Sequence, residues 1–151
     1  DSPTEEEHIV VIETNIDDMN PQVYPYLIEK LLAAGAHDAY LVPIIMKKGR
    51  PGILLSVMVA KSKLDAVSQI IYTQTSTIGL RIQNVGRRKL TRRELEIQTQ
   101  FGLVKAKAVL RNGNEIVAPE FEECKRIAEE KGIPLLDVQS ALAAELAQRK
   151  E

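Results

Sequence analysis

Residues 8–35 read HIVVIETNIDDMNPQVYPYLIEKLLAAG, and this stretch decides the class of fold. It opens with HIVVI, a short and mostly β-branched run that is typical of a buried strand. After a polar loop, Asn20 and Pro21 supply a helix cap and a first-turn proline. Apolar residues then recur at helical spacing over 23–34, and Gly35 ends the helix. The stretch therefore predicts a strand followed by an amphipathic helix.

The following segments continue the pattern as strand, strand, helix, strand. Residues 39–46 and 53–60 are strand-like, and residues 64–72 suit a second amphipathic helix. A Thr/Ser cluster then leads into a strand that begins near Ile78. The order β-α-β-β-α-β is that of the ferredoxin-like fold, an α+β architecture in which both helices cover one face of a four-stranded antiparallel sheet. We place this core at residues 8–93.

The remaining residues flank that core. Residues 1–7 are polar and acidic, and we expect a linker or the ragged start of a longer protein. Residues 94–151 are predicted to add a β-hairpin, a further short strand and two C-terminal helices: 94–100 paired with 103–110, a strand around Ile116, and helices at 119–131 and 134–148. We expect this extension to pack with the core as one unit.

Composition excludes several classes of protein. Hydrophobic residues make up 44% and charged residues 27%, which is globular usage rather than that of a disordered chain. Lys+Arg is 20 against Asp+Glu at 21, so the chain lacks the basic excess that is typical of nucleic-acid-binding proteins. No apolar run approaches the ~20 residues of a membrane helix. One cysteine cannot form an internal disulfide, which favours a reducing compartment. We therefore expect a cytoplasmic protein with neither nucleic acid nor membrane as a partner.

Three carboxylates, Glu13, Asp17 and Asp18, lie within six residues after the first predicted strand. A hard divalent cation with oxygen ligands would relieve their mutual repulsion. The alternative is a solvated loop in which Asn15 or Asp17 bonds the local backbone and the next helix dipole favours the negative charge.

Two further segments could hold an anion. Lys47, Lys48 and Arg50 surround a glycine on the connection between two strands, although a solvated turn has the same composition. Hydroxyl groups and a local run of arginines follow the second helix, and their alternative is pairing with local backbone and with the abundant Glu: Thr75, Ser76, Thr77, Arg81, Arg87 and Arg88. Alternation along a strand would place Arg81 and Arg87 on one face. Neither a P-loop nor a G-x-G-x-x-G motif is present.

Other reactive side chains are sparse. Cys124 is the single cysteine, and His8 and His37 are far apart in the sequence, so each is more typical of a structural residue than of a ligand. The sequence assembles no Ser-His-Asp or Cys-His arrangement, and it names no catalytic residue.

Four motifs occur in order along the chain: ETNIDDMNP (13–21), MKKGRPG (46–52), TSTIGLR (75–81) and PEFEEC (119–124). Together they resemble the C-terminal domain of the nickel insertion protein of nickel-pincer cofactor biosynthesis, the LarC family. The resemblance covers about residues 8–138. Family members are longer and carry an N-terminal domain, so the resemblance implies that this chain is a C-terminal fragment.

The resemblance implies a CTP-dependent cyclometallase, a lyase that inserts nickel into pyridinium-3,5-bisthiocarboxylic acid mononucleotide and converts CTP to CMP and diphosphate. It further implies that this domain binds CTP with Mg²⁺ or Mn²⁺ and assembles into a homo-oligomer. The triphosphate would then lie against the lysines, arginines and hydroxyls above, and Asp17 and Asp18, with Glu13 nearby, would orient the metal.

Two rival functions use the same topology. A non-catalytic ferredoxin-like domain could sense a small molecule or serve as an oligomerisation module. An RNA-binding domain of RRM type needs aromatic side chains on its sheet, and two Phe, four Tyr and no Trp do not supply that signature.

Overall fold

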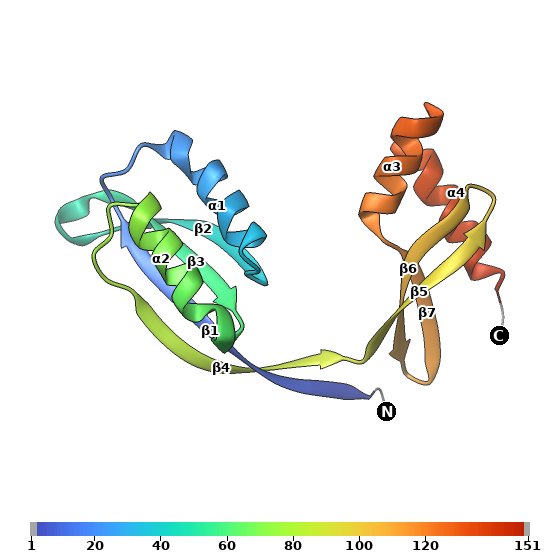
Figure 1. Cartoon of the computed structure of the whole chain (residues 1–151), viewed down its shortest axis with the longest axis horizontal. Helices are drawn as coiled ribbons and strands as arrows, with labels where there is room; N and C mark the ends of the chain where they lie inside the picture. The colour runs from blue at the N-terminus through green and yellow to red at the C-terminus, as the bar shows by residue number, and fades with distance from the viewer. Residues whose placement is uncertain (1–2, 150–151) are drawn as a thin grey trace. The chain divides into compact units, whose positions relative to one another are not determined.

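The structure is a computed structural model that describes residues 3–149. Its contacts divide these residues into two compact units, which are described separately: a ferredoxin-like unit, residues 6–87, and a C-terminal unit, residues 3–5 with 88–149 (Figure 1). Each unit encloses its own apolar core. The expected boundary after residue 93 lies close to this division, and the packing of the two parts as one unit stays a prediction.

The ferredoxin-like unit contains the predicted β-α-β-β-α-β order. Its main elements are β1 (Thr4–Ile16), α1 (Tyr24–Ala33), β2 (Asp38–Ile45), β3 (Pro51–Val59), α2 (Leu64–Gln74) and β4 (Arg81–Leu90). Short 3-10 turns, η1 (Pro21–Val23), η2 (Lys47–Gly49) and η3 (Lys61–Lys63), join them. The strands form one sheet in the order β2-β3-β1-β4, with β3 antiparallel to both β1 and β2. This arrangement confirms the predicted α+β class and ferredoxin-like topology.

Both helices cover the same face of this sheet (Figure 1). Along β1 the buried side chains of that face are the even-numbered ones, including Ile12, because side chains alternate along a strand. Leu27 and Leu31 of α1, with Val67 and Ile71 of α2, complete the cluster, and all four are fully buried. The helical spacing seen in the sequence is thus the packing face of each helix.

Two strand boundaries differ from the sequence expectation. Strand β1 begins at Thr4, so residues 4–7 belong to a strand and not to a linker. Their run of glutamates offers no apolar face, and Glu7 is instead held by an ion pair with Arg87 of β4. Strand β4 begins at Arg81 rather than near Ile78, because the residues on either side of Ile78 are hydrogen-bonded to a β1 side chain.

The C-terminal unit is a three-stranded antiparallel sheet with two helices. Its elements are β5 (Arg92–Thr99), β6 (Gly102–Arg111), β7 (Asn114–Pro119), α3 (Phe121–Lys131) and α4 (Leu135–Ala147), with the strands in the order β5-β6-β7. The short strand expected around Ile116 is therefore part of one sheet with the predicted hairpin. The main core consists of Val104, Cys124, Ile127, Val138 and Leu142.

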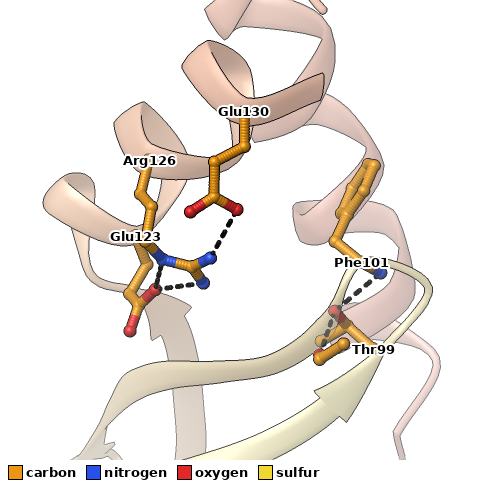
Figure 2. Close-up of polar contacts among 6 residues, drawn as sticks. Thr99, Phe101, Glu123, Arg126 and Glu130 are labelled. Atoms are coloured by element: carbon orange, nitrogen blue, oxygen red, sulfur yellow. Dashed lines mark hydrogen bonds and ion pairs between the residues drawn. The ribbon is translucent and has the colours of Figure 1, made fainter. Parts of the chain in front are cut away.

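Side-chain hydrogen bonds fix two details of this unit (Figure 2). The Thr99 hydroxyl donates to the Gly102 carbonyl at 2.8 Å and accepts from the Phe101 amide at 3.1 Å, which closes the β5–β6 turn. On α3, Arg126 bonds Glu123 and Glu130, three residues before it and four after it. The Arg126 hydrogen bond is the main cause that lowers the pKa of Glu123. No helix within residues 3–149 is long and apolar enough to cross a membrane.

Candidate functional site

The candidate site lies where β1 ends, within the ferredoxin-like unit. The antiparallel register pairs Ile16, the last residue of β1, with Ile53 near the start of β3, so the loop that precedes β3 reaches the same end of the sheet. Strand β4 is the other neighbour of β1, and Arg81 at its start contacts residues 13 and 15. Three segments that are far apart in the sequence, around residues 13–18, 46–50 and 75–81, therefore meet in one unit.

The carboxylates at this end alternate with cationic groups. Asp17 Oδ2 lies 4.0 Å from Arg50 Nη1, and Glu13 Oε2 lies 3.8 Å from Arg81 Nη2. Arg81 also donates to Asn15 Oδ1 at 3.0 Å. Ion pairs this exposed contribute at most about 1 kcal/mol each, so a ligand can replace them at little cost.

Residues 75–80, which join α2 to β4, form the hydroxyl loop. This loop is fixed mainly through Thr14, a buried residue of β1 that is only 3% exposed. Thr14 Oγ1 lies 2.6 Å from Thr77 Oγ1, and each of these oxygens lies 3.1 Å from the Gly79 carbonyl oxygen. The two hydroxyl protons can satisfy two of these three contacts at a time, and in either arrangement both hydroxyls are committed to holding the loop. Thr75 is likewise occupied, because its hydroxyl donates to Ile71 O and accepts from the Thr77 amide. The alternative in which these threonines satisfy local structure is thus what the geometry favours.

Ser76 differs from its neighbours. Its side chain is exposed, and its hydroxyl donates to Asp18 Oδ1. This contact ties the hydroxyl loop to the acidic loop after β1. Ser76 is therefore the hydroxyl of the predicted set that faces both solvent and a carboxylate.

Residues 46–50, which join β2 to β3, form the lysine loop, and its backbone is unusual. Lys48 and Gly49 both adopt positive φ values, 61° and 69°, and a left-handed conformation at a residue other than glycine costs on the order of 1 kcal/mol. The Met46 amide closes the loop by donating to Arg50 O at 2.7 Å. Lys47 and Lys48 are exposed, and within the described residues neither takes part in an ion pair. The loop thus presents three cationic side chains to solvent beside Asp17.

Two of the predicted arginines, Arg87 and Arg88, do not lie at this end of β1. Arg81 and Arg87 share a face of β4, as alternation predicts, since both contact odd-numbered residues of β1. Six residues of strand separate them by about 20 Å, and Arg87 is bound to Glu7. Arg88 falls in the C-terminal unit. The structure therefore does not gather Arg87 and Arg88 with Arg81.

The metal-ligand residues form no complete cage. Within residues 3–149 no three His, Cys, Asp or Glu side chains gather closely enough to hold a metal ion. Glu13 faces Arg81, while Asp17 and Asp18 follow β1 in sequence and contact different partners. Mg²⁺ is usually bound by one or two carboxylates together with substrate phosphates and water. Asp17 and Asp18 could supply the carboxylates of such a site. The described carboxylates alone do not form a metal site.

The remaining candidates lie outside the charged site. Cys124 is 2% exposed in the core of the C-terminal unit, where burial raises the pKa of its thiol. His8 and His37 are exposed on the ferredoxin-like unit.

Sequence reasoning missed Tyr24, which is 5% exposed at the start of α1. Burial, and then the charge of Asp18, raise the pKa of its hydroxyl. In the sequence, Tyr24 is indistinguishable from any apolar position of the helix, so no local signal marks its closeness to Asp18.

Comparison with known proteins identifies the family. The family model described as nickel insertion protein matches residues 1–139. The chain belongs to the nickel insertion protein family. This confirms the resemblance that the four sequence motifs indicate.

Curated relatives agree with this family. A protein of Dictyoglomus thermophilum is 47% identical over 135 residues, covering 89% of this chain and 35% of the relative. The pyridinium-3,5-bisthiocarboxylic acid mononucleotide nickel insertion protein of Thermotoga petrophila is 35% identical over 143 residues, covering 94% of this chain and 36% of the relative. The chain thus spans about a third of the length of the curated relatives it matches.

A solved structure shares the fold over nearly the whole chain. It is LarC2 in its apo form, the C-terminal domain of a cyclometallase involved in the synthesis of the NPN cofactor of lactate racemase. The match has a TM-score of 0.82 and 32% identity, and covers 96% of this chain and all of LarC2. A protein of Methanopyrus kandleri matches with a TM-score of 0.69 and 25% identity over 97% of this chain.

Proposed function

We propose that this chain is the CTP- and divalent-metal-binding part of a nickel-inserting cyclometallase. The whole protein would insert nickel into pyridinium-3,5-bisthiocarboxylic acid mononucleotide, converting CTP to CMP and diphosphate, as a lyase of nickel-pincer cofactor biosynthesis. The observation that carries this proposal is the interleaving of carboxylates with arginines, lysines and an exposed hydroxyl at the end of β1. A metal–triphosphate ligand presents the complementary alternation of charge.

The two kinds of group would divide the ligand between them. The phosphates would replace the carboxylates as partners of Arg50, Ser76 and Arg81. They would also bind the exposed Lys47 and Lys48. Asp17 and Asp18 would face Mg²⁺ or Mn²⁺, directly or through water. When bound, the metal would supply positive charge that neutralises the phosphates. Thr14, Thr75 and Thr77 would act indirectly, because they hold the hydroxyl loop in place.

Nickel is cargo in this scheme. Imidazole and thiolate are the protein ligands that suit it best, and within residues 3–149 no cluster of such groups is formed. The sulfur ligands belong to the substrate. We assign nickel delivery to the remainder of the protein, in keeping with relatives about three times as long as this chain.

We also propose a cytoplasmic homo-oligomer. Tyr40 and Val42 of β2 lie opposite Ser56 and Leu54 of β3, on the sheet face turned away from the helices. They are 46% and 37% exposed, and exposed apolar groups on a sheet face favour association. Light scattering after size exclusion should give a mass that is a multiple of 16.8 kDa, and Tyr40→Glu should lower it.

The nucleotide proposal is tested by calorimetric titration of the chain with CTP, with and without Mn²⁺. Lys48→Ala should abolish binding and the thermal protection by CTP. Lys61→Ala is the matched control, because Lys61 is an exposed lysine just beyond the opposite end of β3. Equal binding by both variants would remove the lysine loop from the site. A non-catalytic sensor would bind CTP without converting it to CMP and diphosphate. Product analysis with the full-length protein therefore distinguishes the two functions.

A further inference from the structure

A buried serine hydroxyl on the ferredoxin-like sheet has no partner. Ser56 lies in the middle of β3, on the sheet face turned away from the helices, and is 1% exposed. Its Oγ forms no hydrogen bond within residues 3–149. An unpaired buried hydroxyl costs free energy, and most such groups in folded proteins are paired. The Ser56 hydroxyl therefore destabilises the ligand-free chain, which points to a role in another state of the protein.

The antiparallel register places a carboxylate beside this hydroxyl. Glu13 of β1 is the register partner of Ser56, so the two side chains stand on the same face of the sheet. Directly opposite residues have Cβ atoms about 4.5–5.5 Å apart, which is within reach of a glutamate side chain. A carboxylate accepts hydrogen bonds and a serine hydroxyl can donate one. The two groups are thus matched, although they are not bonded in the ligand-free chain.

Glu13 is held instead from its other side. Strand β4 is the second neighbour of β1, and Glu13 Oε2 lies 3.8 Å from Arg81 Nη2. A charge-assisted hydrogen bond between such groups spans about 2.7–2.9 Å, and both side chains are partly exposed. The ion pair is therefore weak and easily replaced. Glu13 thus stands between a cation on one neighbouring strand and an unpaired hydroxyl on the other.

A phosphate at Arg81 would change the balance between these two partners. It would occupy the guanidinium and repel the Glu13 carboxylate, because like charges a few ångströms apart destabilise each other. Both χ1 rotamers of a strand residue that are common, near 180° and near −60°, are open to a glutamate, so the carboxylate can change sides without strain. On the β3 side it accepts a hydrogen bond from the Ser56 hydroxyl.

We propose that Ser56 is a positioning residue of the nucleotide site, whose hydroxyl binds the Glu13 carboxylate when a ligand phosphate displaces it from Arg81. This inference rests on the proposed nucleotide-binding function. The unpaired hydroxyl destabilises the free chain, and its new hydrogen bond stabilises the complex. Part of the affinity for the ligand therefore comes from a residue that does not touch it.

The test is Ser56→Ala, which removes the hydroxyl and little else. In the ligand-free chain it should raise the Tm by about 2–4 °C, because a buried unpaired group is lost. In calorimetric titration with CTP and Mn²⁺ it should weaken binding about tenfold, since the displaced carboxylate loses its partner. A serine with only a packing role would not change stability and affinity in opposite directions. Ser62→Ala is the matched control, because Ser62 is an exposed serine of η3 whose hydroxyl should affect neither quantity.

A double-mutant cycle with Glu13→Ala identifies the partner of the hydroxyl. In that background Ser56→Ala should leave CTP affinity unchanged, because no carboxylate remains to be bound. An equal loss of affinity with and without Glu13 would overturn the inference. So would a lower Tm of ligand-free Ser56→Ala, since the hydroxyl would then already have a partner in the free chain. Unchanged CTP binding by Ser56→Ala would overturn it while sparing the nucleotide site, whereas a wild-type chain that binds no CTP would refute the proposed function itself.

Discussion

Asp17→Asn should reduce the dependence of nucleotide binding on metal. In the ligand-free chain Asp17 Oδ2 is 4.0 Å from Arg50 Nη1, and both side chains are partly exposed, at 33% and 64%. At that distance and in a water-like dielectric, one unit charge pair is worth about 1 kcal/mol. Removing the carboxylate charge frees Arg50 for phosphate and relieves repulsion of the triphosphate. Metal-free CTP should therefore bind about fivefold more tightly.

With metal present, the same substitution should have the opposite sign. The introduced amide would be a weaker and uncharged metal ligand, so CTP with Mn²⁺ should bind about tenfold less tightly, equivalent to about 1.4 kcal/mol. The ratio of the two affinities should thus fall about fiftyfold, the product of the two changes. That ratio is insensitive to errors in protein concentration that affect both titrations.

The assay is calorimetric titration of CTP in EDTA and in excess Mn²⁺, at low ionic strength. Asp65→Asn is the control, since it makes the same charge change at an exposed residue in the first turn of α2, one helix length from the hydroxyl loop. It should leave both affinities unchanged. If Asp17→Asn weakened CTP equally in both buffers, or left the EDTA titration unaltered, the exchange of partners between Asp17 and phosphate would be refuted.

Three further predictions concern stability. Thr14→Val removes a buried hydroxyl that contacts both Thr77 and Gly79, so it should cost about 1–2 kcal/mol in urea unfolding and speed amide exchange in the hydroxyl loop, whereas Thr14→Ser should retain most of both. Leu142→Ala empties a fully buried position of the C-terminal core and should destabilise that unit by about 2–5 kcal/mol; a change as small as that of a surface substitution would contradict the packing. Burial raises the pKa of the Cys124 thiol, so the unfolded chain releases this proton first as the pH rises. The free energy of unfolding should then fall above the ordinary thiol pKa of about 8.5, and this decline should be smaller in Cys124→Ala.

The sequence alone was enough for the ferredoxin-like topology and the family. The spacing of Leu27 and Leu31, like that of Val67 and Ile71, marks the buried face of each helix directly, because a helix packs through one stripe. The polar N-terminal segment was misjudged because it has no such apolar pattern. Residues 4–7 lie in β1 without any apolar alternation, and strands of that kind leave no local signal.

The residues of the candidate site could likewise be predicted only in part from the sequence. Local sequence marked Asp17, Arg50 and Arg81 through charge and loop position, and strand alternation correctly placed Arg81 and Arg87 on one face. It could not name their partners, since a shared face says nothing about which residue of the neighbouring strand lies opposite each arginine. Register decided that Arg81 meets the end of β1 while Arg87 meets Glu7.

Composition, periodicity and motif order thus determined the fold class, the family and the types of group available for binding. Only the tertiary structure decided which of those groups meet, that Thr14 and Thr77 hold the loop, and which residues lie on either side of Glu13. The physical reason is that secondary structure follows from neighbours along the chain. A site depends instead on contacts between residues far apart in the sequence, which the folding of the chain brings together.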